Sequence, residues 1–210
     1  MEKSLNDYKH IIWDWNGTLF DDASLTLSIM NGMLSKRGLP NLSKEIYADV
    51  FDFPVKDYYQ EIGWDFEKHS FESLSDEFIF EYYRRHRECP LRDGAKEILR
   101  SNSIPQSILT ASKQSDIDLL VKHFGLDDLF TGVNGLDNHH AAGKLEIGKK
   151  WVKELVIESK QILMVGDTTH DAELAKDLGM DCVLIVGGHQ SRDRLEKCGV
   201  PVISELQELV

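Results

Sequence analysis

The sequence is short of features that mark several large classes of protein. Basic residues are outnumbered, since 24 lysines and arginines stand against 36 aspartates and glutamates and give a net charge of −12. Nucleic acid and anionic membrane surfaces are therefore not expected as general partners, although local positive groups can still bind an anionic substrate. Cysteines are few, odd in number and widely spaced (Cys89, Cys182 and Cys198). This pattern predicts free thiols in a reducing cytoplasm rather than disulfides.

Long apolar runs, internal repeats and low-complexity segments are also missing. Residues 1–10 contain no apolar stretch of signal-peptide type, and no later run is long enough to span a bilayer. A chain of 210 residues with 41% hydrophobic content can bury a full core, and it fits one domain with a modest insertion. We therefore expect a cytoplasmic protein, monomer or homodimer, without a membrane partner.

Short apolar runs that end in polar residues recur along much of the chain. They predict strands at residues 11–13, 106–109, 129–132, 162–165 and 182–186. Helical patterns lie between or after them, at residues 95–100, 116–124, 146–156, 172–178 and 191–197. Such alternation predicts an α/β fold with a doubly wound, Rossmann-like parallel sheet covered on both faces.

Residues 23–88 have a different texture, because no convincing strand occurs among them. One helix is predicted around Leu25, Ile29 and Met33, a second over residues 43–53, and a longer third helix from Phe71 to Tyr82 and beyond. We interpret this block as an all-helical insertion between the first and second strands. The predicted division is residues 1–21 and 90–210 for the α/β core and residues 22–89 for the helical domain.

Polar side chains that can perform chemistry follow several of the predicted strands. In a doubly wound sheet, neighbouring strand ends converge on one crevice. Asp14 and Asp167 could hold Mg²⁺, which favours oxygen ligands. Thr110, with the backbone N–H groups from Ala111 on, could bind an oxyanion. Lys144 could supply a fixed positive charge, and Asp171 could support it from the turn that enters a helix. Together these groups could handle a phosphoryl group.

Four ordered motifs make the chain resemble the haloacid dehalogenase-like superfamily, and within it the phosphoglycolate phosphatase-like branch with a helical cap. The first motif, Asp-x-Asp-x-Thr, corresponds to residues 14–18, which read Asp-Trp-Asn-Gly-Thr. The second, a Thr or Ser after an apolar strand, corresponds to Thr110. The third is Lys144, and the fourth, Gly-Asp-x-x-x-Asp, covers residues 166–171. The resemblance spans the whole chain and places the cap at the helical insertion.

This resemblance implies a Mg²⁺-dependent phosphatase that acts on a small phosphorylated metabolite. Asp14 would be the nucleophile that forms an aspartyl-phosphate. Mg²⁺ would be held by Asp14, by the backbone carbonyl of Asn16 and by Asp167. Thr110, Ala111 and Lys144 would bind the phosphoryl oxygens. Asp171 would orient Lys144 or a metal-bound water.

One residue departs from the family pattern. The second Asp of the first motif protonates the leaving oxygen in these phosphatases, whereas this chain has Asn16, which has no proton to give near neutral pH. Four explanations fit: a slow phosphatase, an enzyme that borrows another acid–base group, a phosphate-binding protein with little turnover, or an engineered substitution. A dehalogenase is a further reading, but the carboxylates at 167 and 171 fit Mg²⁺ phosphoryl chemistry better.

Histidines are the candidates for a borrowed acid–base group. His139 and His140 could supply it from a loop, although a solvated loop pair is the simpler reading. His170 and His189 flank predicted strand ends and could either approach the substrate or bond to the backbone. Lys149, which follows Lys144 on the same predicted helix, fits a solvated helix face.

Overall fold

The computed structural model describes residues 4–136 and 144–209. Within them, six strands form one parallel sheet in the order β3-β2-β1-β4-β5-β6. The strands are β1 (His10–Trp13), β2 (Gln106–Lys113), β3 (Gly132–Leu136), β4 (Ile162–Gly166), β5 (Asp181–Ile185) and β6 (Val202–Ile203). The chain order reverses on either side of β1, so the carboxyl ends of β2, β1, β4 and β5 are neighbours at one edge of the sheet.

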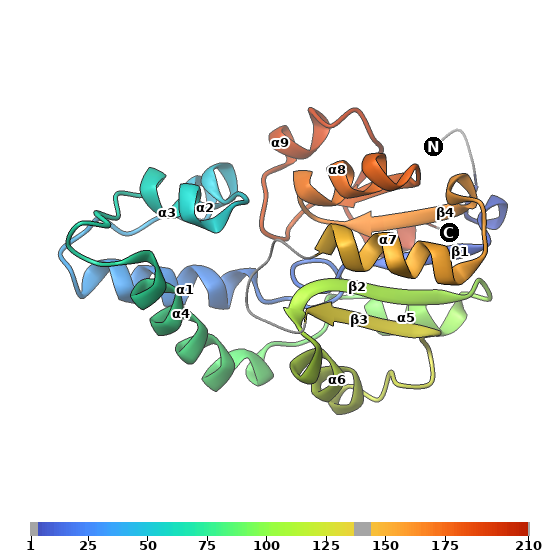
Figure 1. The fold of residues 1–210 in the computed structure, drawn as a ribbon, viewed down its shortest axis with the longest axis horizontal. Helices are drawn as coiled ribbons and strands as arrows, with labels where there is room; N and C mark the ends of the chain where they lie inside the picture. The colour runs from blue at the N-terminus through green and yellow to red at the C-terminus, as the bar shows by residue number, and fades with distance from the viewer. Residues whose placement is uncertain (1–3, 137–143, 210) are drawn as a thin grey trace.

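Helices cover both faces of this sheet (Figure 1). One face packs against α5 (Ala95–Ser101), α6 (Gln114–His123) and the 3₁₀ helix η5 (Leu206–Leu209). The other packs against α7 (Lys144–Leu155), α8 (Thr169–Leu178) and α9 (Arg192–Glu196). Strand β1 feeds both layers, because Ile11 and Trp13 point to one side and Ile12 to the other. The predicted doubly wound α/β fold is confirmed.

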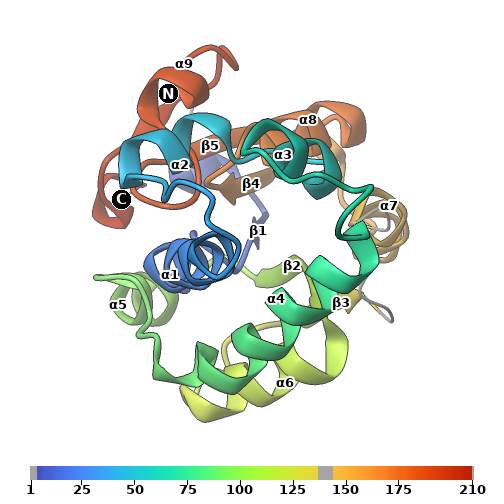
Figure 2. The ribbon, with the colours of Figure 1, turned by 90° about the vertical axis from the view of Figure 1, so that its left-hand side faces the viewer.

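Four helices form a separate body beside the sheet: α1 (Ala23–Ser35), α2 (Lys44–Val50), α3 (Val55–Glu61) and α4 (Phe71–Arg85). They lie beyond the carboxyl ends of the strands (Figures 1 and 2). Their apolar faces meet in a hydrophobic cluster of their own, distinct from the two layers of the sheet. This body is the helical cap. The predicted residue boundaries between cap and core, at 21/22 and 89/90, stay a prediction.

None of the described helices is long and apolar enough to cross a membrane.

Short 3₁₀ helices lie between the longer elements. Besides η5, the described 3₁₀ helices are η1 (Leu5–Asp7), η2 (His86–Glu88) and η4 (Ser159–Gln161). At η2, the two ring nitrogens of buried His86 contact the carbonyls of Tyr82 and Tyr83 and, at 2.9 Å, the carboxylate of Asp116. This contact ties the carboxyl end of α4 to the core.

Several elements differ from the sequence prediction, and strand β6 was not among the predicted strands. Strand β3 covers Gly132–Leu136 rather than residues 129–132, because Leu129 and Phe130 pack on the core from a loop. Strand β2 continues to Lys113, with a register shift after Leu109, instead of ending at residue 109. Helix α3, over Val55–Glu61, was not predicted. Its apolar contacts come from Val55, Tyr58 and Tyr59, at helical spacing, and from Ile62 directly after the helix.

Candidate active site

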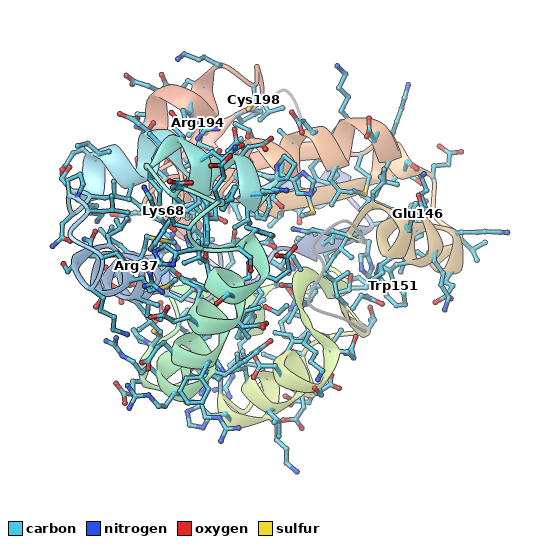
Figure 3. All side chains as sticks on the ribbon, turned by 60° about the vertical axis from the view of Figure 1, so that its left-hand side comes forward. Arg37, Lys68, Glu146, Trp151, Arg194 and Cys198 are labelled. Atoms are coloured by element: carbon cyan, nitrogen blue, oxygen red, sulfur yellow. The ribbon has the colours of Figure 1, made fainter. Side chains whose placement is uncertain are left out.

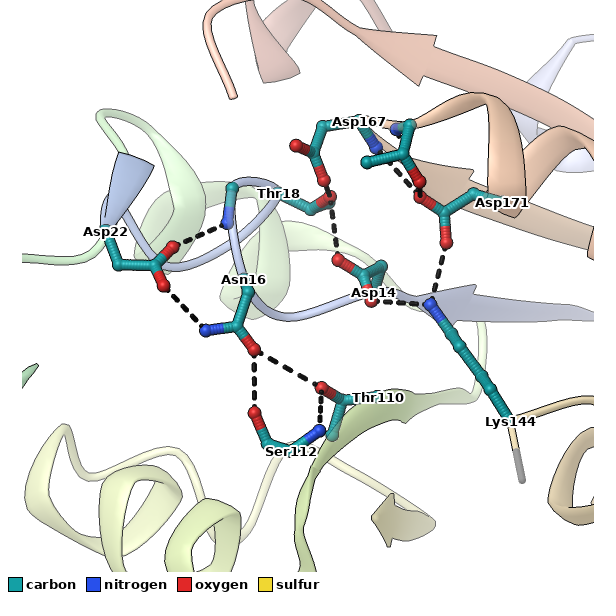
Figure 4. A network of polar contacts seen from close by, with 11 residues as sticks. Asp14, Asn16, Thr18, Asp22, Thr110, Ser112, Lys144, Asp167 and Asp171 are labelled. Carbon is teal, nitrogen blue, oxygen red and sulfur yellow. Dashed lines mark hydrogen bonds and ion pairs between the residues drawn. The ribbon is translucent and has the colours of Figure 1, made fainter. Parts of the chain in front are cut away.

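The predicted site residues of the first and fourth motifs meet where strands β1 and β4 end. Asp14 follows β1 directly, and its backbone N–H donates to the carbonyl of Val165 on β4 at 2.9 Å. Asp167 follows β4 in the same way. Both carboxylates are buried, with 6% of Asp14 and 0% of Asp167 exposed. The parallel register of β1 and β4 therefore brings the two acidic groups to one place (Figure 4).

Lys144 supplies the positive charge between the carboxylates of Asp14 and Asp171. It is the first residue of α7, and its side chain is 4% exposed. Its Nζ lies 2.7 Å from a carboxylate oxygen of Asp14 and 2.7 Å from one of Asp171. Burial opposes the charged form, but both carboxylates outweigh it and raise the pKa of Lys144. The ammonium is therefore kept charged beside Asp14.

Asp171 is held by more donors than Lys144 alone. Its second oxygen accepts hydrogen bonds from the backbone N–H groups of Asp167 (3.2 Å) and Thr168 (3.1 Å) and from the Thr168 hydroxyl (2.7 Å). The contact from the Thr168 N–H is one half of a capping box in the first turn of α8. With both oxygens engaged, Asp171 is placed to position Lys144.

Asp167 occupies a space that two glycines leave open. Its oxygens accept from the Thr18 hydroxyl at 2.9 Å and from the backbone N–H of His189 at 2.7 Å. A Cβ at Gly17 or at Gly188 would lie 2.2 Å from the Asp167 carboxylate. Gly17 also has a φ of +73°, a conformation that other residues rarely adopt. Both glycines are thus required by the position of this carboxylate.

The site carries more negative than positive charge. Asp14, Asp167 and Asp171 each offer an oxygen within 4.8 Å of the others, and Lys144 is the one ammonium bonded to this group within the described residues. Burial raises the pKa of Asp14, and the neighbouring carboxylates add to this against the effect of Lys144. Burial and Asp171 likewise raise the pKa of Asp167, against the lowering effect of His189. A buried set of oxygen ligands with an excess of negative charge fits Mg²⁺.

Thr110 and Ser112 bring β2 to the same edge. Thr110 is fully buried, and its Oγ1 accepts from the backbone N–H of Ser112 at 3.1 Å. Half-buried Ala111 lies between them in the strand. The hydroxyls of Ser112 and Thr110 reach the side-chain oxygen of Asn16, at 2.7 Å and 3.5 Å. The second motif therefore contacts the first through Asn16.

The other end of the Asn16 amide meets residues that the sequence analysis did not identify. Its Nδ2 donates to Asp22 at 2.7 Å and to the Tyr82 hydroxyl at 2.7 Å. Asp22 is 1% exposed and also accepts from the Tyr82 hydroxyl at 2.6 Å and from the backbone N–H of Gly17 at 2.9 Å. The sequence does not indicate which of the adjacent residues Asp21 and Asp22 enters the site. Tyr82 was predicted only as part of the third helix of the insertion. Its ring packs on the cap cluster, and its hydroxyl enters the site.

The histidines have distinct positions. The His189 ring contacts the Tyr47 hydroxyl at 2.7 Å and Asp22 at 3.3 Å. Burial opposes its charge, but Asp22 and the other nearby carboxylates raise the pKa of His189 to about 9. His170 packs its ring against Phe53 of the cap, at a centroid distance of 5.2 Å. His139 and His140 lie outside the described residues.

The loop after β5 also joins the core to the cap. The Ser191 N–H donates to the Ala48 carbonyl at 3.0 Å, and the Gln190 amide donates to the Phe51 carbonyl at 2.9 Å. Arg194 donates to the Phe51 carbonyl at 2.6 Å and pairs with Asp52 at 2.6 Å. In Figure 3, Arg194 lies where the cap meets the core. The carboxyl end of α2 is thereby fixed over the site.

Comparison with known proteins defines the class of this fold and site. The family model described as haloacid dehalogenase-like hydrolase matches residues 11–185, and the chain belongs to this family. It is 23% identical over 199 residues to phosphoglycolate phosphatase of Synechococcus elongatus, covering 88% of this chain and 87% of that protein. It is also 23% identical to tyrosine-protein kinase PtkA of Mycobacterium tuberculosis, covering 92% of this chain and 67% of that protein.

Solved structures give the same fold. A haloacid dehalogenase-like protein of Agrobacterium tumefaciens superimposes with a TM-score of 0.81 at 22% identity, and the match covers 96% of each chain. At this level of sequence identity, the structural similarity supports the fold and no particular function. The predicted resemblance is confirmed, and so at family level is the predicted enzyme class, a phosphatase hydrolase.

Proposed function

We propose that the protein is a Mg²⁺-dependent phosphatase that hydrolyses a small phosphorylated metabolite through an aspartyl-phosphate at Asp14, in the cytoplasm. The observation that carries this proposal is the buried contact of Lys144 with Asp14, beside Asp167 and Asp171. A carboxylate nucleophile needs an adjacent positive charge to let a phosphate dianion approach. Lys144 supplies that charge, and Asp171 holds it in place.

Mg²⁺ would be held by the carboxylates of Asp14 and Asp167 and by the backbone carbonyl of Asn16. When bound, it would neutralise part of the phosphoryl charge as a Lewis acid. Thr110 and the backbone N–H of Ala111 would bind phosphoryl oxygens beside Lys144. One carboxylate oxygen of Asp14 would then attack phosphorus while the leaving oxygen departs on the opposite side.

The cap would select the substrate and exclude water during this reaction. Tyr82 reaches the site from α4, and Tyr47 reaches His189 from α2. Both side chains therefore stand between the helical cap and the strand ends. Residues of this kind, rather than the motifs, would define which metabolite fits.

Phosphate release from small phosphorylated compounds tests this proposal. Asp14→Asn keeps the shape of the side chain but removes the nucleophile, so release should fall to background while the thermal unfolding temperature shows a folded protein. Removal of divalent metal with EDTA should abolish release by the wild type, and added Mg²⁺ should restore it. Full activity in Asp14→Asn would contradict the proposal.

A phosphate-binding protein with little turnover is the second candidate. The observation in its favour is Asn16, whose amide cannot act as a general acid or base near neutral pH. A protein of this kind would bind inorganic phosphate in calorimetry and release none from any phosphorylated compound. Turnover that depends on Asp14 would exclude it.

A further inference from the structure

Both N–H groups and the oxygen of the Asn16 side-chain amide have hydrogen-bond partners. Its two N–H donors are taken by Asp22 and Tyr82, both at 2.7 Å, and its oxygen accepts from Ser112 at 2.7 Å. The orientation of the amide is therefore fixed, because only its nitrogen can face the carboxylate of Asp22. The Asn16 side chain is therefore held in place by the surrounding site through hydrogen bonds on both sides of its amide.

Asp22, the carboxylate that is hydrogen-bonded to the Asn16 amide, has no proton to give to a leaving oxygen in place of the missing acid. It accepts from the Gly17 N–H, the His189 ring, the Asn16 amide and the Tyr82 hydroxyl. With these four donors directed at its two oxygens, the buried carboxylate is placed as an acceptor only. Asp22 is accordingly a fixed anion.

Tyr82 is equally unsuited to donate a proton to a leaving group. Its hydroxyl proton is directed at Asp22, at 2.6 Å. Among the described side chains that contact Asn16, the remaining two are the neutral hydroxyls of Thr110 and Ser112.

A site arranged in this way discriminates between phosphate compounds by their leaving oxygen. An alkoxide is a strong base and needs a proton as the phosphorus–oxygen bond breaks. A phenolate, a carboxylate or a phosphate is a weaker base and can depart as an anion. We propose that this site takes phosphoryl donors whose leaving oxygen departs as a stable anion, namely aryl phosphates, acyl phosphates and phosphoanhydrides, in preference to alkyl phosphate esters. This inference rests on the proposed phosphatase function.

The transfer step is balanced without a general acid. A carboxylate oxygen of Asp14 forms a bond to phosphorus, and the bond from phosphorus to the leaving oxygen breaks with its electron pair on that oxygen. The products are the aspartyl-phosphate and the free phenolate, carboxylate or phosphate. In the second step, water attacks phosphorus, the bond to Asp14 breaks, and the water protons go to the released phosphate and the solvent. No base on Asn16 assists that attack, so the second step is the slow one for these donors.

Leaving-group release by the purified full chain with Mg²⁺ tests this proposal. The donors are 4-nitrophenyl phosphate, phenyl phosphate, acetyl phosphate and glycerol phosphate. We expect kcat/KM to fall steeply as the leaving oxygen becomes more basic, with the alkyl ester slower than the aryl esters by about a hundred- to ten-thousand-fold. With 4-nitrophenyl phosphate, rapid mixing should show a burst of about one nitrophenolate per protein before a slower steady state.

A double variant offers a matched test, because Asn16 and Asp22 share one hydrogen bond. Asn16→Asp with Asp22→Asn exchanges the amide and the carboxylate across that bond and keeps the net charge. The hydrogen bonds to Tyr82, Gly17 and Ser112 can all re-form with the new groups. This variant should raise glycerol phosphate turnover towards the aryl rate and should reduce the burst. Asn16→Asp alone sets two carboxylates face to face and should gain much less.

The possible results separate this inference from the proposed function. Glycerol phosphate turnover as efficient as phenyl phosphate turnover, lost in Asp14→Asn, would overturn the leaving-group preference and leave the phosphatase standing. No release from any donor would overturn both. If the double variant does not fold, the donor series on the wild type decides alone.

Discussion

Replacing Lys144 should lower the free energy of unfolding strongly. Lys144→Met would leave the carboxylates of Asp14 and Asp171 buried without their shared ammonium, at side-chain exposures of 9% and 1%. Breaking one partner of a buried ion pair costs about 3–5 kcal/mol. Urea unfolding in EDTA should show a loss of this size. Lys149→Met, on the exposed face of the same helix, should change stability by less than about 0.5 kcal/mol. Equal effects would contradict the buried network.

Single residues could be predicted from the sequence where a motif fixes them. Asp14, Thr110, Asp167 and Asp171 were expected together because each follows or flanks a strand, and the structure brings them together. Lys144 was singled out by its place before a helix. Asp22 could not be found in this way, because its approach to Asn16 depends on the tight loop from Gly17 to Phe20. The catalytic and binding roles stay proposals.

Among the elements, α9 anchors the cap through Arg194. Its guanidinium donates to the carbonyls of Asp49 (3.1 Å) and Phe51 (2.6 Å), which lie at the carboxyl end of α2. Arg194→Ala should raise hydrogen exchange in α2 about tenfold, because charged hydrogen bonds of this kind are lost. Mass spectrometry of the peptides that cover residues 44–50 measures this change.

The same helix provides the control. Arg192 pairs with Glu196 and Ser204, both on the core side, so Arg192→Ala should leave exchange in α2 unchanged. An equal increase in both variants would mean that Arg194 does not anchor the cap specifically.

Elements could be predicted where one pattern dominates the segment. Strands β1, β4 and β5 are nearly continuous apolar runs, as fully buried parallel strands require. Strand β3 was misplaced because its Gly-Val-Asn-Gly-Leu sequence is not an apolar run. Helix α3 was not predicted, although Val55, Tyr58 and Tyr59 follow helical spacing and pack in the cap cluster. Its 7 residues give only about two turns of that pattern, which is too short a stretch to mark a helix without its packing partners.

At the scale of the whole molecule, the insertion places a cap over the carboxyl ends of the strands (Figure 2). Its position follows from the sequence, because a helical block between the first two strands must leave the sheet where β1 ends. The contacts that hold it there could not be predicted, since Tyr47, Tyr82 and Phe51 look like ordinary apolar positions. They meet the core through His189, through Asp22 and Asn16, and through the loop after β5 together with Arg194.

Direct detection of the phosphorylated residue is the most decisive measurement for Asp14 as the nucleophile. The wild type and Asp14→Asn are mixed briefly with 4-nitrophenyl phosphate and Mg²⁺, quenched in acid and digested for peptide mass spectrometry. The account predicts one added phosphoryl group on the wild-type peptide that contains Asp14, lost again as inorganic phosphate appears, and none on the variant. Steady phosphate release without any phosphoryl group on Asp14, or release that persists in Asp14→Asn, would contradict it.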